Sequence, residues 1–164
     1  MNRFQKSLSK EFAIDFVYII RKEKIYMVKL LIGTKGSGKT KRLIDEVNKA
    51  LATTKGNVVC IEKNKVLSYN VNYQARLVTT DDYGISGYPM LYGLLCGLCS
   101  GNHDITDVLV DATLRIGSRD PQETAAFLKR VSELSTMAET DFVFTLSINE
   151  EELPAEVFEF CKKI

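Results

Sequence analysis

An eight-residue segment with three glycines, Gly33-Thr34-Lys35-Gly36-Ser37-Gly38-Lys39-Thr40, constrains this chain more than any other feature. It follows a short apolar run at 28–32, which has the length and composition of a buried β-strand. It precedes residues 39–52, where apolar side chains recur at helical spacing. A glycine-rich turn between a strand and a helix favours phosphate binding, because backbone N–H groups and the helix N-terminus point toward one anion.

The rest of the chain alternates between apolar runs, which predict strands, and segments with helical spacing. Further strands are expected at 57–61, 76–80, 108–110 and 142–146, and further helices at 90–99, 120–134 and 154–163. The helix at 90–99 is so apolar that we expect it to be buried. Strands that alternate with helices indicate βαβ units. The sequence therefore predicts an α/β fold with a mostly parallel sheet covered on both faces.

Composition limits the class of protein. The chain has 164 residues, of which 45% are hydrophobic and 26% charged, as in one globular domain. Its net charge of +1 gives no general attraction to nucleic acid. The apolar run at 16–20 is far shorter than the ~20 residues of a membrane-spanning helix and lacks a signal-peptide cleavage site. We therefore expect a cytoplasmic protein without a membrane span.

The N-terminal residues differ from the rest of the chain. Residues 1–26 carry six basic and three acidic residues, and Met27 directly precedes the first expected strand. We expect residues 1–26 to form an N-terminal extension and residues 27–164 to form the nucleotide-binding domain. Two interpretations of the extension stay open: an artefact of start-site assignment, or a genuine basic arm.

The glycine-rich segment matches G-x-x-x-x-G-K-[ST] at every fixed position, and it resembles the Walker A segment of the P-loop NTPase superfamily. The run Val108-Leu109-Val110-Asp111 resembles the Walker B strand of the same superfamily. The resemblance implies a three-layer α/β/α sandwich in which residues 33–40 bind the phosphates of ATP. It also implies a catalytic role for Lys39 at the β- and γ-phosphates, and Mg²⁺ binding by Thr40 and Asp111. ATP and Mg²⁺ are the expected cofactors.

Several branches of the superfamily have signatures that this chain lacks. Ala112 occupies the position after Asp111, where many hydrolysing members have glutamate. The guanine-binding N-K-x-D signature and the paired C-x-x-C motifs of thymidine kinases are absent, and the chain is too short for a secretion or twitching-motility ATPase. We favour a likeness to RecA-like and AAA-type ATPases. That likeness predicts one strand between the Walker A and Walker B strands, whereas kinase-like or GTPase-like domains place these two strands side by side.

A general base is expected from Glu62, which ends the second predicted strand. Ligands of parallel sheets bind beyond the carboxyl ends of the strands, and RecA-like ATPases have a similarly placed acidic residue. A carboxylate there can orient water or accept a hydroxyl proton. Asp81 and Asp82, after the next strand, are the alternative candidates.

Four further residues are weaker candidates. Thr145 and Ser147 end the strand at 142–146, where RecA-like and AAA-type ATPases have a polar residue that senses the γ-phosphate. Arg115 and Arg119 follow Asp111, where they can clamp a phosphate or act as an arginine finger, although surface arginines are common before a helix.

The function expected from the sequence is that of a Mg-dependent ATP-binding protein, a small and slow P-loop ATPase. Two alternatives stay open: a non-hydrolysing binding module that responds to nucleotide, and a small-molecule or nucleoside kinase. The segment at 63–89 is the only one large enough to form a lid or a partner surface, so a protein partner or an oligomer is also open.

Overall fold

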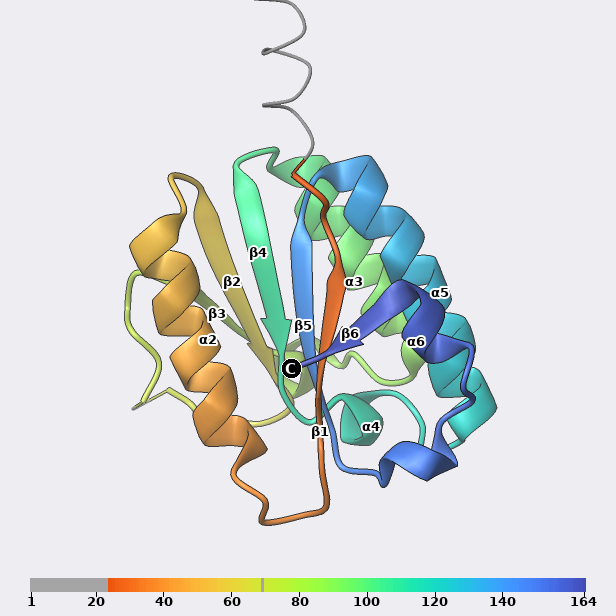
Figure 1. Ribbon diagram of the computed structural model, residues 1–164. Coiled ribbons are helices and arrows are strands. Elements are labelled where there is room, and N and C mark those ends of the chain that lie inside the picture. Colours follow the sequence, from red (N-terminus) through yellow and green to blue (C-terminus); the bar gives the residue numbers. More distant parts are fainter. Residues whose placement is uncertain (1–23, 69) are drawn as a thin grey trace, which may run out of the picture.

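A computed structural model of the protein describes residues 24–68 and 70–164, and it contains a six-stranded, all-parallel sheet in the order β3-β2-β4-β5-β1-β6 (Figure 1). The strands are β1 (Val28–Ile32), β2 (Asn57–Glu62), β3 (Arg76–Thr79), β4 (Ile105–Val110), β5 (Asp141–Leu146) and β6 (Cys161–Lys163). The predicted α/β class is confirmed. The prediction that one strand separates the 28–32 strand from the strand before Asp111 is also confirmed, because β5 lies between β1 and β4.

Helices cover both faces of this sheet. They are α2 (Lys39–Thr53), α3 (Tyr88–Gly101), α4 (Thr113–Ile116), α5 (Pro121–Ala138) and α6 (Val157–Phe160), with short 3₁₀ turns at Thr80–Tyr83 and Glu150–Glu152. Leu30 packs on the side of α3 and α5, whereas Leu31 packs on the side of α2, so β1 contributes to two apolar layers. Among the described residues, no helix is both long and apolar enough to cross a membrane.

Local signals explain where two of the helices begin. The Asp120 side chain accepts hydrogen bonds from the N–H groups of Gln122 (2.8 Å) and Glu123 (3.0 Å), and Pro121 stands in the first turn of α5. Helix α2 instead begins directly after Gly38, whose φ of 83° ends the glycine-rich loop. The first turn of α2 is thereby joined to the end of β1 at the carboxyl edge of the sheet.

The predicted helix at 154–163 is wrong. Only Val157–Phe160 is helical, and Cys161–Lys163 forms β6, which pairs with β1. The register places Val28 opposite Cys161 and Leu30 opposite Lys163. Backbone groups on that side of β1 need hydrogen-bond partners, and this requirement outweighs the local helical pattern.

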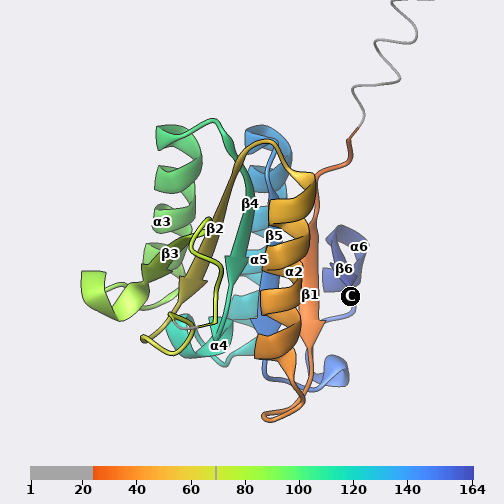
Figure 2. The same ribbon diagram turned by 90° about the vertical axis from the view of Figure 1, so that its left-hand side faces the viewer.

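The apolar segment at 90–99 forms a helix as predicted, but the expected burial holds on one side of the helix only. Helix α3 extends from Tyr88 to Gly101 and lies in an outer layer of the molecule (Figure 2). Leu91 and Leu95 are fully buried, while Gly93 and Gly97 are exposed. The composition of the helix therefore reflects more than packing against its own sheet.

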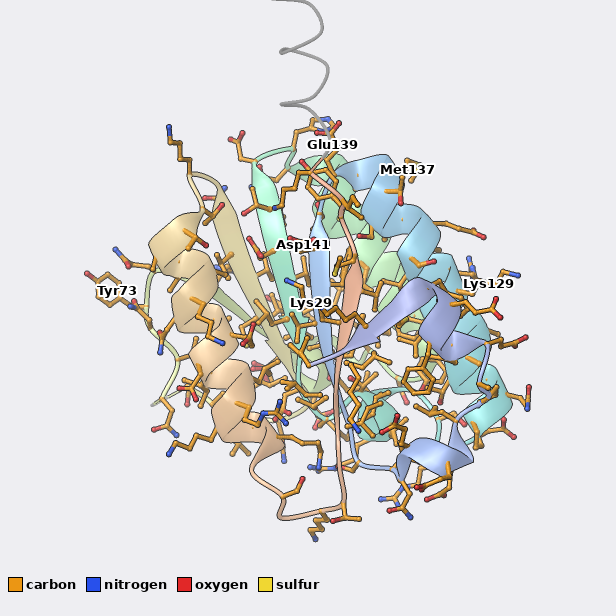
Figure 3. All side chains as sticks on the ribbon, viewed as in Figure 1. Lys29, Tyr73, Lys129, Met137, Glu139 and Asp141 are labelled. Atoms are coloured by element: carbon orange, nitrogen blue, oxygen red, sulfur yellow. The ribbon has the colours of Figure 1, made fainter. Side chains whose placement is uncertain are left out.

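The expected boundary at Met27 lies near the first described residues, and residues 1–23 of the expected extension lie outside them. The Lys24 ammonium lies 3.1 Å from the Asp141 carboxylate, which also accepts a hydrogen bond of 3.0 Å from the Met27 N–H. Figure 3 shows Asp141 at the end of the sheet opposite the glycine-rich loop. The residues just before β1 are thus bound to the domain by an ion pair and a hydrogen bond, and both interpretations of the extension stay predictions.

Candidate functional site

The glycine-rich loop leaves the carboxyl end of β1 and turns back into α2 (Figure 1). Gly36 and Gly38 both have a φ of 83°, in the left-handed region that favours glycine. A Cβ atom at Gly33 would lie 2.6 Å from Ser37 Oγ and 3.3 Å from Ser37 Cβ, so a side chain there would displace the Ser37 side chain. The backbone path therefore favours glycine at 36 and 38, and the contact with Ser37 favours it at 33.

Lys39 begins α2 and folds its side chain back over the loop. Its ammonium donates to the Thr34 carbonyl oxygen at 2.7 Å and to Ser37 Oγ at 3.3 Å, and the residue is only 7% exposed. Burial lowers the pKa of Lys39, and the negative charge of Asp111 partly opposes this effect. The loop thus holds a cation at its centre, within reach of an anion bound by the loop N–H groups.

Thr40 and Asp111 are 71 positions apart in sequence, and their side chains meet. Thr40 Oγ1 lies 3.2 Å from Asp111 Oδ2, and the Asp111 N–H donates to the Ile61 carbonyl oxygen at the end of β2. Hydroxyl and carboxylate oxygens are the ligands that Mg²⁺ prefers. No group of three or more His, Cys, Asp or Glu side chains suited to a metal exists among the described residues. An ion here would therefore draw its other ligands from phosphate and water, as Mg²⁺ commonly does.

Thr145 contacts the other carboxylate oxygen of Asp111. Its hydroxyl donates to Asp111 Oδ1 at 2.7 Å and accepts from the Ala112 N–H at 2.9 Å, and the residue is 3% exposed. The donor hydrogen of Thr145 is thus committed to the carboxylate, and its expected role as a phosphate sensor stays a prediction. Ser147 lies exposed beyond the end of β5.

The backbone conformation of Ala112 is a feature of the site that the sequence did not indicate. It adopts a φ of 54°, an unusual left-handed conformation for alanine, and it directly precedes α4. Alanine does not indicate a left-handed conformation in the sequence. The turn depends instead on the hydrogen bond from the Ala112 N–H to the Thr145 hydroxyl, a residue far along the chain. This conformation turns the chain from Asp111 into the first residue of α4.

We expect Thr145→Val to lower the stability of the folded protein. The variant keeps the shape but leaves the Ala112 N–H without its acceptor, which costs about 1–3 kcal/mol. Thermal denaturation should show a lower Tm, by about 2–4 °C for each kcal/mol in a chain of this size. Thr145→Ser restores the hydroxyl and should recover the wild-type Tm. A valine variant with the wild-type Tm would contradict the role of this hydrogen bond.

Glu62 ends β2, as predicted, and is only 2% exposed. Its Oε2 accepts the N–H groups of Val66 (2.8 Å) and Leu67 (2.7 Å), and its Oε1 accepts the Thr79 hydroxyl at 3.3 Å. These contacts hold the turn after β2 and the end of β3 rather than joining Glu62 to Lys39 or Thr40. The geometry explains a structural role for Glu62, and its catalytic role stays a prediction.

Cys60 is a buried residue of β2, and its thiol is near enough to Asp111 and Glu62 to be affected by their charges. Burial raises the pKa of Cys60 to about 12, and the negative charges of Asp111 and Glu62 add to this effect. A thiol with such a pKa stays protonated at neutral pH and is inert as a nucleophile. Cys60 therefore contributes packing rather than chemistry.

The other candidate side chains lie at the surface. Asp81 and Asp82 pair with Lys63 (2.9 Å) and Lys65 (3.1 Å), which join the turn after β3 to the segment after β2. Arg115 and Arg119 are exposed on α4 and the turn that follows it. The structure brings none of these four expected residues into hydrogen-bond contact with Thr40 or Asp111. Their expected roles stay predictions.

A scan of the chain against models of known protein families finds no match, and a search among curated proteins finds none either.

Proposed function

We propose that this protein binds ATP together with Mg²⁺ in the glycine-rich loop, as a P-loop NTPase with the strand order of RecA-like and AAA-type ATPases. The observation that carries the proposal is the contact of 3.2 Å between Thr40 Oγ1 and Asp111 Oδ2. These residues follow β1 and β4, two strands separated by β5, and they come together at the carboxyl edge, where parallel sheets bind ligands.

The loop has the parts that bind a polyphosphate. The N–H groups of residues 33–40 and the N-terminus of α2 would hold the phosphate oxygens. Lys39 would exchange its contacts with Thr34 and Ser37 for phosphate oxygens, and Thr40 and Asp111 would hold the metal. Bound Mg²⁺ supplies charge neutralisation at the phosphates.

Hydrolysis by this site should be slow. Ala112 replaces the glutamate that many hydrolysing members have at this position, and the carboxylate of Glu62 is committed to three hydrogen bonds. Neither position offers a free base to the attacking water. We therefore propose a slow ATPase.

One connection in the structure favours the alternative of a nucleotide-responsive binding module. The Ile116 carbonyl at the end of α4 accepts the Gly87 N–H at 2.7 Å, and the Tyr88 hydroxyl donates to the Ser118 carbonyl oxygen at 3.0 Å. These segments line a hollow of about 350 Å³ near the first turns of α3 and α5. If Asp111 moved on nucleotide binding, α4 would move with it and would change the shape of this surface.

The test compares wild type with Asp111→Asn by calorimetric titration of ATP, with and without Mg²⁺. We expect the substitution to weaken Mg-ATP binding by at least tenfold and to remove the dependence on Mg²⁺, because a charged ligand of the metal is lost. Asp81→Asn removes the same charge at an exposed ion pair and serves as the control. Failure of the wild-type protein to bind Mg-ATP would refute the proposal.

Phosphate release by the same proteins separates the two candidate functions. Turnover above roughly one per minute, still far below the typical enzymatic kcat of about 10 s⁻¹, would support the slow ATPase. Tight binding without release would support the binding module.

A further inference from the structure

Helix α3 has an unusual composition for a helix in an outer layer. None of its 14 residues, Tyr88–Gly101, is charged. The other two long helices present charged side chains to solvent, including Lys41 and Arg42 on α2 and Lys129 on α5. A surface helix normally carries such residues on its outer side, and a helix that is apolar all round is normally buried. The outer side of α3 therefore has the composition of an interface.

The side chains of α3 form rows four residues apart. The row against the sheet is buried, and it consists of Leu91, Leu95 and Cys99. The outward row consists of glycines, Gly93, Gly97 and Gly101, and a Cβ atom added at any of them would meet nothing within 4 Å. The row beside the glycines is apolar and partly exposed, with Met90 at 49% exposure and Leu94 and Leu98 half-buried. A ridge of apolar side chains thus lies next to a groove of the same spacing.

We propose that α3 is a self-association surface, on which the same helix of a second copy of this chain packs about a two-fold axis. Two helices pack when the i±4 ridge of one enters the i±4 groove of the other. In a two-fold interface each copy presents the same patch, so that patch must contain both the ridge and the groove. The row of Met90, Leu94 and Leu98 and the row of glycines meet that requirement on a single helix. Charge is absent from both, so the pairing buries no unpaired ion.

A hollow of about 360 Å³ continues this surface beyond the helix. It is lined by Gly97, Leu98 and Gly101 of α3 together with Gln74 and Arg76 at the edge strand β3. Figure 2 shows α3 and β3 side by side at one edge of the molecule. The apolar rows would form the centre of the contact, and the polar residues of β3 would form its rim, as in other protein interfaces.

The size of the helix sets the expected strength of the contact. At 1.5 Å per residue, α3 is about 21 Å long and about 10–12 Å wide, which covers far less than the roughly 800 Å² per partner of a standard interface. Even with the adjoining hollow, the contact belongs to the small and transient class. We therefore expect a weak and reversible monomer–dimer equilibrium, as in the transient class of interfaces.

Sedimentation equilibrium of the full chain without nucleotide, from about 1 to 300 µM, tests this surface independently of the proposed ATP site. In the variant with both Gly93→Ala and Gly97→Ala, the added methyl groups fill the groove, so the dissociation constant should rise at least tenfold. The Tm measured at about 1 µM should rise by about 2–4 °C for each alanine, because alanine favours the helix and its Cβ meets no atom in the single chain. A purely structural role for these glycines does not predict a weaker dimer together with a more stable single chain.

A second variant tests the ridge. Met90→Glu places a charge in the contact and should also weaken the dimer at least tenfold. Met137→Glu makes the same change at a residue of α5 that is 75% exposed and points away from the domain (Figure 3), and it should leave the equilibrium unchanged. A wild-type chain that is monomeric at 300 µM would overturn the proposal, as would a dimer that survives both α3 variants. Binding of the monomer to phosphatidylcholine vesicles through α3 would overturn it in favour of a lipid surface.

Discussion

Replacing Lys39 by alanine is expected to weaken the binding of Mg-ATP by more than tenfold. The ammonium is buried at the centre of the glycine-rich loop, where it contacts Thr34 and Ser37 and would meet the phosphates directly. A hydrogen bond to a charged group contributes about 1.5–3 kcal/mol, which corresponds to roughly a 10- to 150-fold change in the dissociation constant. Isothermal titration calorimetry with Mg-ATP measures the change directly.

Lys35→Ala is the matched control for this variant. Lys35 stands in the same loop and carries the same charge, but it is exposed to solvent. Its removal should change affinity by no more than about threefold, because exposed charges are screened by water and salt. Equal losses in both variants would assign the effect to the net charge of the loop. An unchanged affinity in Lys39→Ala would contradict nucleotide binding by this loop.

Replacing Glu62 by alanine is expected to cost the folded protein about 3–5 kcal/mol, because the N–H groups of Val66 and Leu67 and the Thr79 hydroxyl lose one shared acceptor. The Tm should fall by roughly 10 °C in a chain of this size. Glu62→Gln keeps one acceptor oxygen and should cost less. Thermal denaturation of the two variants ranks these effects. A Tm within about 1 °C of wild type in Glu62→Ala would contradict the structural role of this carboxylate.

The glutamine variant also tests the catalytic role predicted for Glu62. Loss of a general base typically lowers turnover by 10²- to 10⁴-fold while binding survives. A carboxylate that only holds the turn after β2 leaves turnover per folded molecule near the wild-type value. Asp81→Asn and Asp82→Asn are the controls, since each removes one negative charge at the alternative site. Turnover that falls in these controls and not in Glu62→Gln would transfer the role to the aspartate pair.

Much of the architecture could be predicted because its causes are local. The apolar runs at 28–32 and 142–146 form β1 and β5, and the cap at Asp120 begins α5 as expected. The contact between Thr40 and Asp111 also agrees with the resemblance, since both residues follow strands of one parallel sheet. Side chains at the carboxyl ends of such strands meet at one edge, whatever their separation in sequence.

The features that could not be predicted depend on distant partners. Cys161–Lys163 forms a strand only because one side of β1 lacks a neighbour, and nothing within those three residues indicates it. The burial of Glu62 depends on the pairing of β2 with β3, which brings Thr79 beside it. The exposed outer side of α3 could not be predicted either. An apolar helix can pack against its own sheet or against another molecule, and its composition does not distinguish these two cases.

The pairing of β1 has a consequence for how the protein is made. β1 is hydrogen-bonded to β5 and β6, so both of its neighbours come from residues 141–163, far along the chain. Roughly a hundred residues separate Ile32 from Asp141, which at about 5–20 residues per second corresponds to about 5–20 s of synthesis on a ribosome. During that interval the apolar strand before the glycine-rich loop has emerged without its partners. The loop can therefore take its final shape only after β5 has been made, and nucleotide binding by a nascent chain would mark the end of folding rather than its beginning.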